Sequence, residues 1–167
     1  MKKICQTLVL PVVACIAATG VATAKDAIRY KAPNPQMPMA LAVEVPATQD
    51  MVFLSGAVPD LVDQNAAKDS AQAYDDTEAQ TVSVLRRIEK TLQSMHLGMR
   101  DVVKMQVFLV GDPAHAGRMD FAGFMRGYRQ FFGTKAQPEL PARSVVQVAG
   151  LVRPGWLVEI EATAMRR

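Results

Sequence analysis

The sequence predicts an α+β domain with a mixed, largely antiparallel sheet and two helices on one face of that sheet. Two segments place apolar residues at helical spacing, and the other apolar segments alternate as strands do. Their order is strand, strand, helix, strand, helix, strand, strand, which leaves the second face of the sheet without a helix. At 167 residues the chain has room for one compact domain.

The beginning of the chain has the pattern of a secretory signal peptide. Lys2 and Lys3 precede an uncharged, mostly apolar segment that ends in the A-x-A site of Ala22 and Ala24. We expect residues 1–24 to be removed, which makes the mature protein periplasmic or secreted and free of the membrane. An uncleaved anchor is an open alternative, because the apolar segment is long enough to span a bilayer.

Cys5 and Cys15 both lie in that first segment, so cleavage after Ala24 leaves a mature chain without thiols or disulfides. The sequence VVAC at Cys15 resembles a bacterial lipobox, which makes lipidation a further alternative. His96 and His115 are the two histidines, and no Cys or His spacing resembles a zinc site. We therefore expect no metal cofactor.

The charge balance argues against a nucleic-acid partner. Of the 19 basic residues, Lys2 and Lys3 lie in the signal peptide, which leaves 17 against 16 acidic residues. Binding of nucleic acid requires a clustered basic face, whereas the short stretches LRRIEK and MRR fit solvated surfaces. We expect a small molecule as the partner.

Residues 25–36 are predicted to be an extended leader, because KDAIRYKAPNPQMPM contains three prolines and little periodicity. The domain proper is predicted over residues 37–167. Its first two strands are expected at 41–45 and 51–56, joined as a hairpin by PATQD. A loop rich in Asp, Gln and Ala follows to about Tyr74.

Residues 75–98 form the clearest helix pattern in the chain. Asp75 is expected to cap the N-terminus with Glu78 three residues later, and Gly98 offers a left-handed stop. One apolar stripe follows helical spacing and comprises Val82, Leu85, Ile88, Leu92 and Met95. We expect this stripe to pack on the sheet while the basic residues of the helix face solvent.

A strand and a second helix follow. In DVVKMQVFLVGD, residues 101–112, apolar side chains alternate with polar ones, as in a strand buried on one face. In MDFAGFMRGYRQFFG, residues 119–133, aromatic residues and Met125 recur at helical spacing. We expect the second helix to lie on the same sheet face as the first.

The last two strand segments, ARSVVQVAG and WLVEIEATAM, decide the character of the uncovered face. Arg143, Val145 and Gln147 share one face of the first strand, and Glu159 and Glu161 share one face of the second. We assign both sets to the sheet face that has no helix. That face is then too apolar for open water and too charged for a core, so subunits are expected to associate there.

Four motifs carry a resemblance to a known family: FLSGAVP near the start, VVKMQVFLVGD in the middle, then LPARSVVQVAGL and VEIEATAMRR. In this order, over residues 37–167, they resemble the Rid family of reactive-intermediate deaminases, also called YjgF-like proteins. The resemblance implies the chorismate mutase-like fold of that family and a barrel-like homotrimer with a ligand cleft at each subunit interface. It also implies hydrolysis of reactive 2-imino acids, such as 2-iminobutanoate and 2-iminopropanoate, to 2-oxo acids and ammonia without any cofactor.

The same resemblance implies the site residues. Arg143 matches the arginine that grips the substrate carboxylate, for which its planar fork and permanent charge are suited. Glu159 matches the acid that helps to place and activate the hydrolytic water. Gly56 matches a backbone contact near the ligand, and Val145 matches a position that lines the pocket.

Two positions depart from the family pattern. Better-studied members have a tyrosine where this chain has Met39, and an asparagine in the second helix where it has Met125. A buried hydrogen bond to a charged group contributes about 1.5–3 kcal/mol. Replacing two polar contacts by thioethers is therefore expected to alter the rate or to favour larger, more apolar imino acids.

Other interpretations of these residues stay open. Arg143 beside a strand that carries carboxylates also fits an interface ion pair, and Glu161 competes with Glu159 for the chemical role. A trimer that binds small carboxylates without turning them over is the alternative function. A Ser-His-Asp hydrolase would lack its G-x-S-x-G elbow, and a nuclease or translation inhibitor fits poorly with a near-neutral mature chain.

Overall fold

The computed structural model of the chain describes residues 26–34 and 36–167. The predicted signal peptide and its cleavage site after Ala24 lie outside the described residues. The main elements, in chain order, are β1 (Ile28–Lys31), β2 (Ala40–Glu44), β3 (Met51–Phe53), α1 (Thr77–Ser94), β4 (Val102–Val110), α2 (Phe121–Tyr128), β5 (Ala142–Val148) and β6 (Val158–Met165). Three short 3-10 turns lie between them, at Ala71–Ala73, Met99–Asp101 and Pro113–His115.

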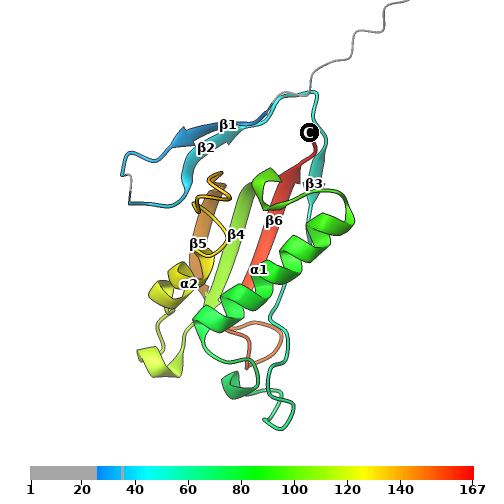
Figure 1. Cartoon of the computed structure of the whole chain (residues 1–167). Coiled ribbons are helices and arrows are strands. Elements are labelled where there is room, and N and C mark those ends of the chain that lie inside the picture. Colours follow the sequence, from blue (N-terminus) through cyan, green and yellow to red (C-terminus); the bar gives the residue numbers. More distant parts are fainter. Residues whose placement is uncertain (1–25, 35) are drawn as a thin grey trace, which may run out of the picture.

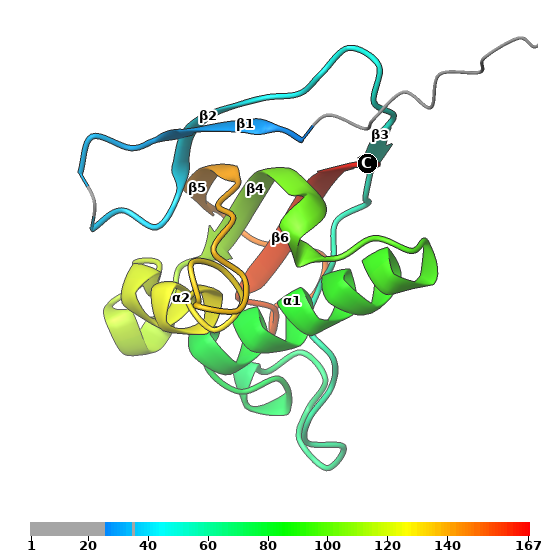
Figure 2. The ribbon, with the colours of Figure 1, turned by 45° about the horizontal axis from the view of Figure 1, so that its top comes forward.

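The strands form one mixed sheet in the order β1-β2-β5-β4-β6-β3. β4 pairs with β5 in parallel and with β6 in antiparallel fashion, and these three long strands form the centre of the sheet. Both helices lie on one face of that centre, side by side (Figures 1 and 2). The structure thus confirms the predicted α+β class with two helices on one sheet face.

The first strands differ from the prediction in two ways. β1 lies inside the segment expected to be an extended leader, and it pairs with β2 from Ile28 opposite Glu44 onward. The expected hairpin between β2 and β3 is wrong, because β3 pairs with β6 at the far edge. The connection crosses the end of the sheet (Figure 2). Four strand spacings measure about 19 Å, and the seven residues from Glu44 to Met51 can reach about 23 Å, so proximity in sequence does not enforce pairing.

Helix α1 follows the predicted pattern with small shifts. Its cap is Asp76, whose carboxylate accepts from the Ala79 N–H at 2.8 Å, rather than Asp75. Leu85, Ile88 and Leu92 of the predicted stripe are fully buried, and Val84 joins them. The left-handed residue after the helix is His96, with φ of 59°, and not Gly98.

The sheet register corrects the face predicted for Arg143. Arg143 lies opposite Met105 and Val145 lies opposite Val107, and both partners on β4 are buried under the helices. Side chains of directly paired residues leave a sheet on the same side, so Arg143 and Val145 lie on the helix-covered face. The run ARSVVQV has valines in both alternating sets, so its pattern alone does not distinguish the faces.

Glu159 does lie on the open face, as predicted. It pairs with Phe108, whereas its neighbour Ile160 pairs with Val107 in the core. Phe53 and Val146 are exposed large apolar side chains, and their pairing with Thr163 and Phe108 puts them on the same open face. A mixture of carboxylates and exposed apolar groups without a covering layer is typical of an association surface.

Within the described residues, none of the helices combines the length and apolarity needed to cross a bilayer. The same part of the chain contains no cluster of three or more metal-ligating side chains.

Candidate functional site

Arg143 is a buried cation with no acidic partner in the part of the chain that the structure describes. The residue is 9% exposed, and β5 directs its side chain between the sheet and α2. Its Nη2 donates to the Met125 sulfur at 3.4 Å. Its Nε and Nη1 are buried and have no hydrogen-bond partner among the described residues. Unpaired buried donors on a charged group are rare and costly, so they point to a ligand that completes them.

Two aromatic rings of α2 hold the guanidinium in place. Its central carbon lies 4.2 Å from the ring centroid of Tyr128 and 5.1 Å from that of Phe124. The Tyr128 ring in turn stacks on Phe132 at 4.9 Å. Cation–π contacts fix a guanidinium plane without neutralising its charge. The sequence interpretation placed these aromatics in the core only, and their helical spacing gave no signal of the second role.

Burial decides the electrostatics of this cluster. Loss of solvation lowers the pKa of Arg143, an effect that Tyr128 opposes and Arg129 reinforces. Burial likewise raises the pKa of Tyr128 far above its ordinary value, while the nearby Arg143 and Arg29 act in the opposite direction. A guanidinium stays protonated under any working condition, so the site presents a permanent positive charge in an apolar setting.

Arg29 shows what a structural buried arginine looks like in the same chain. Its side chain is 11% exposed, and its Nε contacts Glu139 at 2.8 Å. Its other nitrogens donate to three backbone carbonyls, those of Arg100, Val102 and Leu140. Arg29 thus ties β1 to the body of the domain with its charge paired. Arg143 has a similar burial and none of these partners.

The structure brings Met125 and Val145 to Arg143. Met125 contacts the guanidinium directly, and Val145 lies two residues further along the same face of β5, half-buried against the core. Gln147, the next residue on that face, was not singled out as a site residue by the sequence. Its side chain donates to the Gly117 carbonyl and accepts from the Met119 N–H, which fixes the turn that leads into α2.

Gly56 and Glu159 form a second group, on the open face of the sheet. A Cβ at Gly56 would collide with Glu159 Oε1, so the glycine leaves the space that the carboxylate occupies. The neighbouring Ala57 pairs with Ile160, which holds the two segments together. Arg143 and Glu159 therefore lie on opposite faces of the sheet, and one chain alone does not bring them together.

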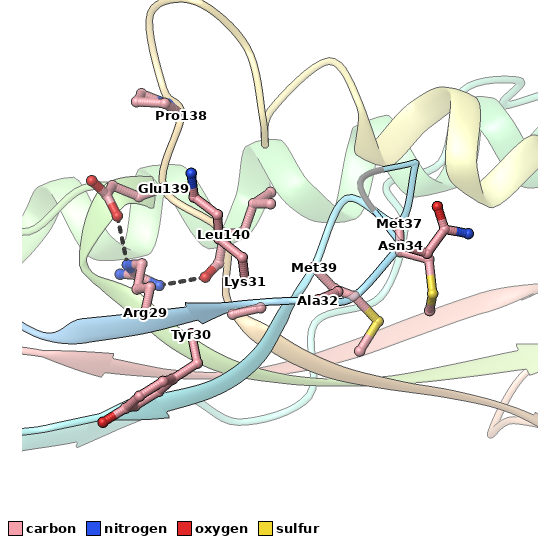
Figure 3. A pocket seen from close by; sticks show the side chains of 11 residues that line it. Arg29, Tyr30, Lys31, Ala32, Asn34, Met37, Met39, Pro138, Glu139 and Leu140 are labelled. Atoms are coloured by element: carbon pink, nitrogen blue, oxygen red, sulfur yellow. Dashed lines mark hydrogen bonds and ion pairs between the residues drawn. The ribbon is translucent and has the colours of Figure 1, made fainter.

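Met39 lies apart from both groups, in a cavity of about 480 Å³. Figure 3 shows this cavity between the β1–β2 segment and the loop before β5, with Met37, Met39 and Arg29 among its lining residues. Arg143 does not line it. The backbone nevertheless brings Met39 near the start of β5, because the next residue, Ala40, donates to the Pro141 carbonyl at 3.0 Å.

The Arg143 cluster is suited to bind a small carboxylate. A guanidinium offers two parallel N–H groups to the two oxygens of a carboxylate, and the surrounding rings, Met125 and Val145 supply apolar contacts. The thioether is a weak acceptor, so a carboxylate oxygen competes easily with it. Within one chain the Met125 sulfur contacts Nη2 of the guanidinium, so an incoming carboxylate that uses this nitrogen has to displace it.

Comparison with known proteins gives one consistent result. The profile of the family described as Endoribonuclease L-PSP matches residues 29–166. A RutC family protein from Haemophilus influenzae is 33% identical over 137 residues, which cover 82% of this chain and 93% of the relative.

Solved structures agree. A YjgF family protein from Neisseria meningitidis superposes with a TM-score of 0.52 at 27% identity, covering 85% of this chain and 96% of the other. TdcF from E. coli, solved with bound serine, superposes with a TM-score of 0.55 at 31% identity, covering 78% and 93%.

Proposed function

Because the chain belongs to the Endoribonuclease L-PSP family, which includes the RutC and YjgF/Rid proteins, we propose that it is a hydrolytic deaminase of reactive 2-imino acids. Its products would be the 2-oxo acid and ammonia. Since the mature chain is near-neutral, its predicted partner is a small acid and not RNA.

The observation that carries the proposal is the unpaired, buried guanidinium of Arg143. Among the described residues no carboxylate neutralises it, and two of its nitrogens lack partners. Every 2-imino acid carries a carboxylate next to the reacting carbon. Binding that carboxylate would satisfy the donors and fix the C=N group relative to the protein. TdcF, with its bound serine, is a relative that holds a small amino acid.

Arg143 and Glu159 can serve one substrate if they come from different subunits. Within a chain the two residues lie on opposite sheet faces, and the open face has the mixed character of an interface. We therefore extend the proposal to a homotrimer, in which Arg143 of one subunit meets Glu159 and Gly56 of the next.

In this arrangement the chemistry needs positioning and modest proton transfer. Water adds to the electrophilic carbon of the protonated imine, and its proton passes to Glu159 or to the leaving nitrogen. The resulting carbinolamine loses ammonia as the C–N bond breaks and the C=O bond forms. Glu159 is half-exposed, so it can reach water and exchange its proton, which suits a general base and acid.

The thioether contact favours apolar substrates and also supports a second candidate function. Met125 contacts Arg143 through a thioether, which is a weaker acceptor than a polar side chain, and Met39 lines the neighbouring cavity. We propose side chains larger and more apolar than that of 2-iminopropanoate as the preferred substrates. If the two methionines remove the rate acceleration while carboxylates still bind, the protein is instead a non-catalytic carboxylate binder.

A trapping assay separates the two functions. An amino-acid oxidase generates 2-iminopropanoate or bulkier imines, and semicarbazide traps whatever imine remains. The deaminase proposal predicts that the wild-type protein depletes trappable imine and that Arg143→Ala and Glu159→Gln do not. Binding of 2-oxo acids without any acceleration would support the binder instead.

A mixing experiment tests the shared site. When Arg143→Ala and Glu159→Gln subunits are refolded together in equal amounts, some interfaces combine an intact arginine with an intact glutamate. Random assembly should restore about a quarter of the wild-type activity. No recovery in assemblies shown to be mixed would contradict a site built from two subunits.

We also propose that the protein works outside the cytoplasm. The support is the signal-peptide pattern that ends at Ala24. The mass of the mature protein from periplasmic or secreted material tests this, since cleavage after Ala24 gives a chain that begins at Lys25.

A further inference from the structure

The contact between Met125 and Arg143 places an oxidisable sulfur on the proposed carboxylate-binding group. Met125 Sδ lies 3.4 Å from Arg143 Nη2, and this contact is weak because a thioether is a poor acceptor. The two remaining nitrogens of the guanidinium have no partner within the described part of the chain. Any strong acceptor created at this sulfur would therefore meet unpaired, charged donors.

Oxidation creates such an acceptor. A peroxide transfers one oxygen atom to the thioether, which loses two electrons, while the peroxide is reduced to water. The product, methionine sulfoxide, has a polar S–O group in place of a lone pair on sulfur. Since the sulfur already contacts Nη2, a small shift of the flexible methionine side chain lets the new oxygen accept a charge-assisted hydrogen bond from the guanidinium.

The sulfur is within reach of small oxidants. Met125 is half-buried on α2, and a site that admits a 2-imino acid also admits a peroxide, which is smaller. Methionine is flexible, and the partly exposed position of Met125 leaves one side of its side chain open to solvent. Rotation of the side chain toward solvent is therefore compatible with its surroundings.

We propose that Met125 is an oxidation-sensitive switch: its sulfoxide binds Arg143 internally and excludes the carboxylate of the ligand. The inference rests on the carboxylate-binding role proposed for Arg143. Reduction of the sulfoxide by a methionine sulfoxide reductase with a thiol reductant returns the thioether and releases the arginine. An exported protein meets oxidants without the cytoplasmic reducing pool, which gives the switch a setting in which to act.

The test compares reduced and peroxide-treated protein in three measurements. Peptide mass mapping gives the extent of oxidation at Met125 and, as internal references, at Met37 and Met51, which are 45% and 38% exposed. Calorimetry gives the affinity for 2-oxobutanoate, a carboxylate of the product class. The NMR signal of the Arg143 Nε–H group reports whether the guanidinium gains a partner.

We expect oxidation of Met125 to weaken 2-oxobutanoate binding by about tenfold or more, because the ligand has to displace a hydrogen bond to a charged group. The Arg143 signal should move, and reductase treatment should reverse both changes. Met125→Leu is the matched control: it keeps an apolar side chain of similar volume and oxidises only at the other methionines. Each variant is compared with its own reduced form, and Met125→Leu should show no change on oxidation.

Two results would overturn the switch. One is complete oxidation of Met125 with unchanged ligand affinity and an unchanged Arg143 signal. The other is a Met125 that stays reduced after Met37 and Met51 are fully oxidised. If the reduced protein neither deaminates imines nor binds 2-oxobutanoate, the proposed function fails on its own. The Arg143 signal still decides whether the sulfoxide binds the guanidinium.

Discussion

Replacing Arg143 with methionine should make the folded chain more stable and leave it unable to bind carboxylates. The side chain is 9% exposed and has no acidic partner among the described residues. Burying an ion away from water without a counter-ion destabilises the folded state by several kcal/mol. The contacts with the rings of Phe124 and Tyr128 stabilise it by about 0.5–2 kcal/mol each. The balance predicts a gain of about 1–3 kcal/mol for Arg143→Met.

Arg29→Met is the matched control for this prediction. Arg29 has similar burial, but it pairs with Glu139 and donates to three carbonyls. Its loss should destabilise the chain by about 1–3 kcal/mol, since the part-buried carbonyls of Val102 and Leu140 would lose their donor. Both substitutions replace an arginine by methionine, and we expect them to change the free energy of unfolding in opposite directions.

Urea unfolding followed by circular dichroism at equal, high protein concentration measures both changes, because dissociation of an oligomer would couple stability to concentration. Binding of 2-oxobutanoate is measured on the same samples. If Arg143→Met destabilises the protein as much as Arg29→Met does, Arg143 is a structural residue. The case for a ligand site at this position would then be lost.

Three further changes test other parts of the structure. Gly56→Ala should push Glu159 from its position, and imine-trapping kinetics should then show kcat lowered at least about tenfold. A thermal scan should show little change in Tm. An unchanged kcat would mean that Glu159 takes no part in the chemistry. Burial raises the pKa of Tyr128, so the stability this group contributes is complete below its unfolded pKa of about 10 and falls as the pH rises above it. Tyr128→Phe should reduce that loss in urea unfolding between about pH 9 and 11, and an identical pH profile would refute the assignment. Gln80→Leu should lower the free energy of unfolding, measured with urea, by about 2–4 kcal/mol, because it leaves the buried Leu157 N–H without its acceptor. An unchanged free energy would mean that water replaces the amide.

The sequence predicted the central elements because their periodicity is strong and local. The alternation of Val103, Met105, Val107 and Leu109 matches the buried positions of β4, and Leu85, Ile88 and Leu92 fix the packed side of α1. The motifs around Arg143 and Glu159 also predicted the family that the comparisons show. These features depend on neighbours within a few residues, so they can be recognised in a single amino-acid sequence.

The residues of the candidate site could be predicted from the sequence, but their positions relative to one another could not. The valines of β5 fall in both alternating sets, so the burial of Arg143 under α2 follows only from its register with Met105. The separation of Arg143 and Glu159 on two sheet faces depends on the same register.

The components of the protein could be identified from its amino-acid sequence alone: helices and strands set by periodicity, and a site made of an arginine, a glutamate and two unusual methionines. The folded chain was needed to establish the pairing of β3 with β6, the contact of Met125 with Arg143 and the absence of an acidic partner for that arginine within the described residues. Hydrogen-bond register and charge compensation depend on segments far apart in the chain, so they become defined only when those segments pack together.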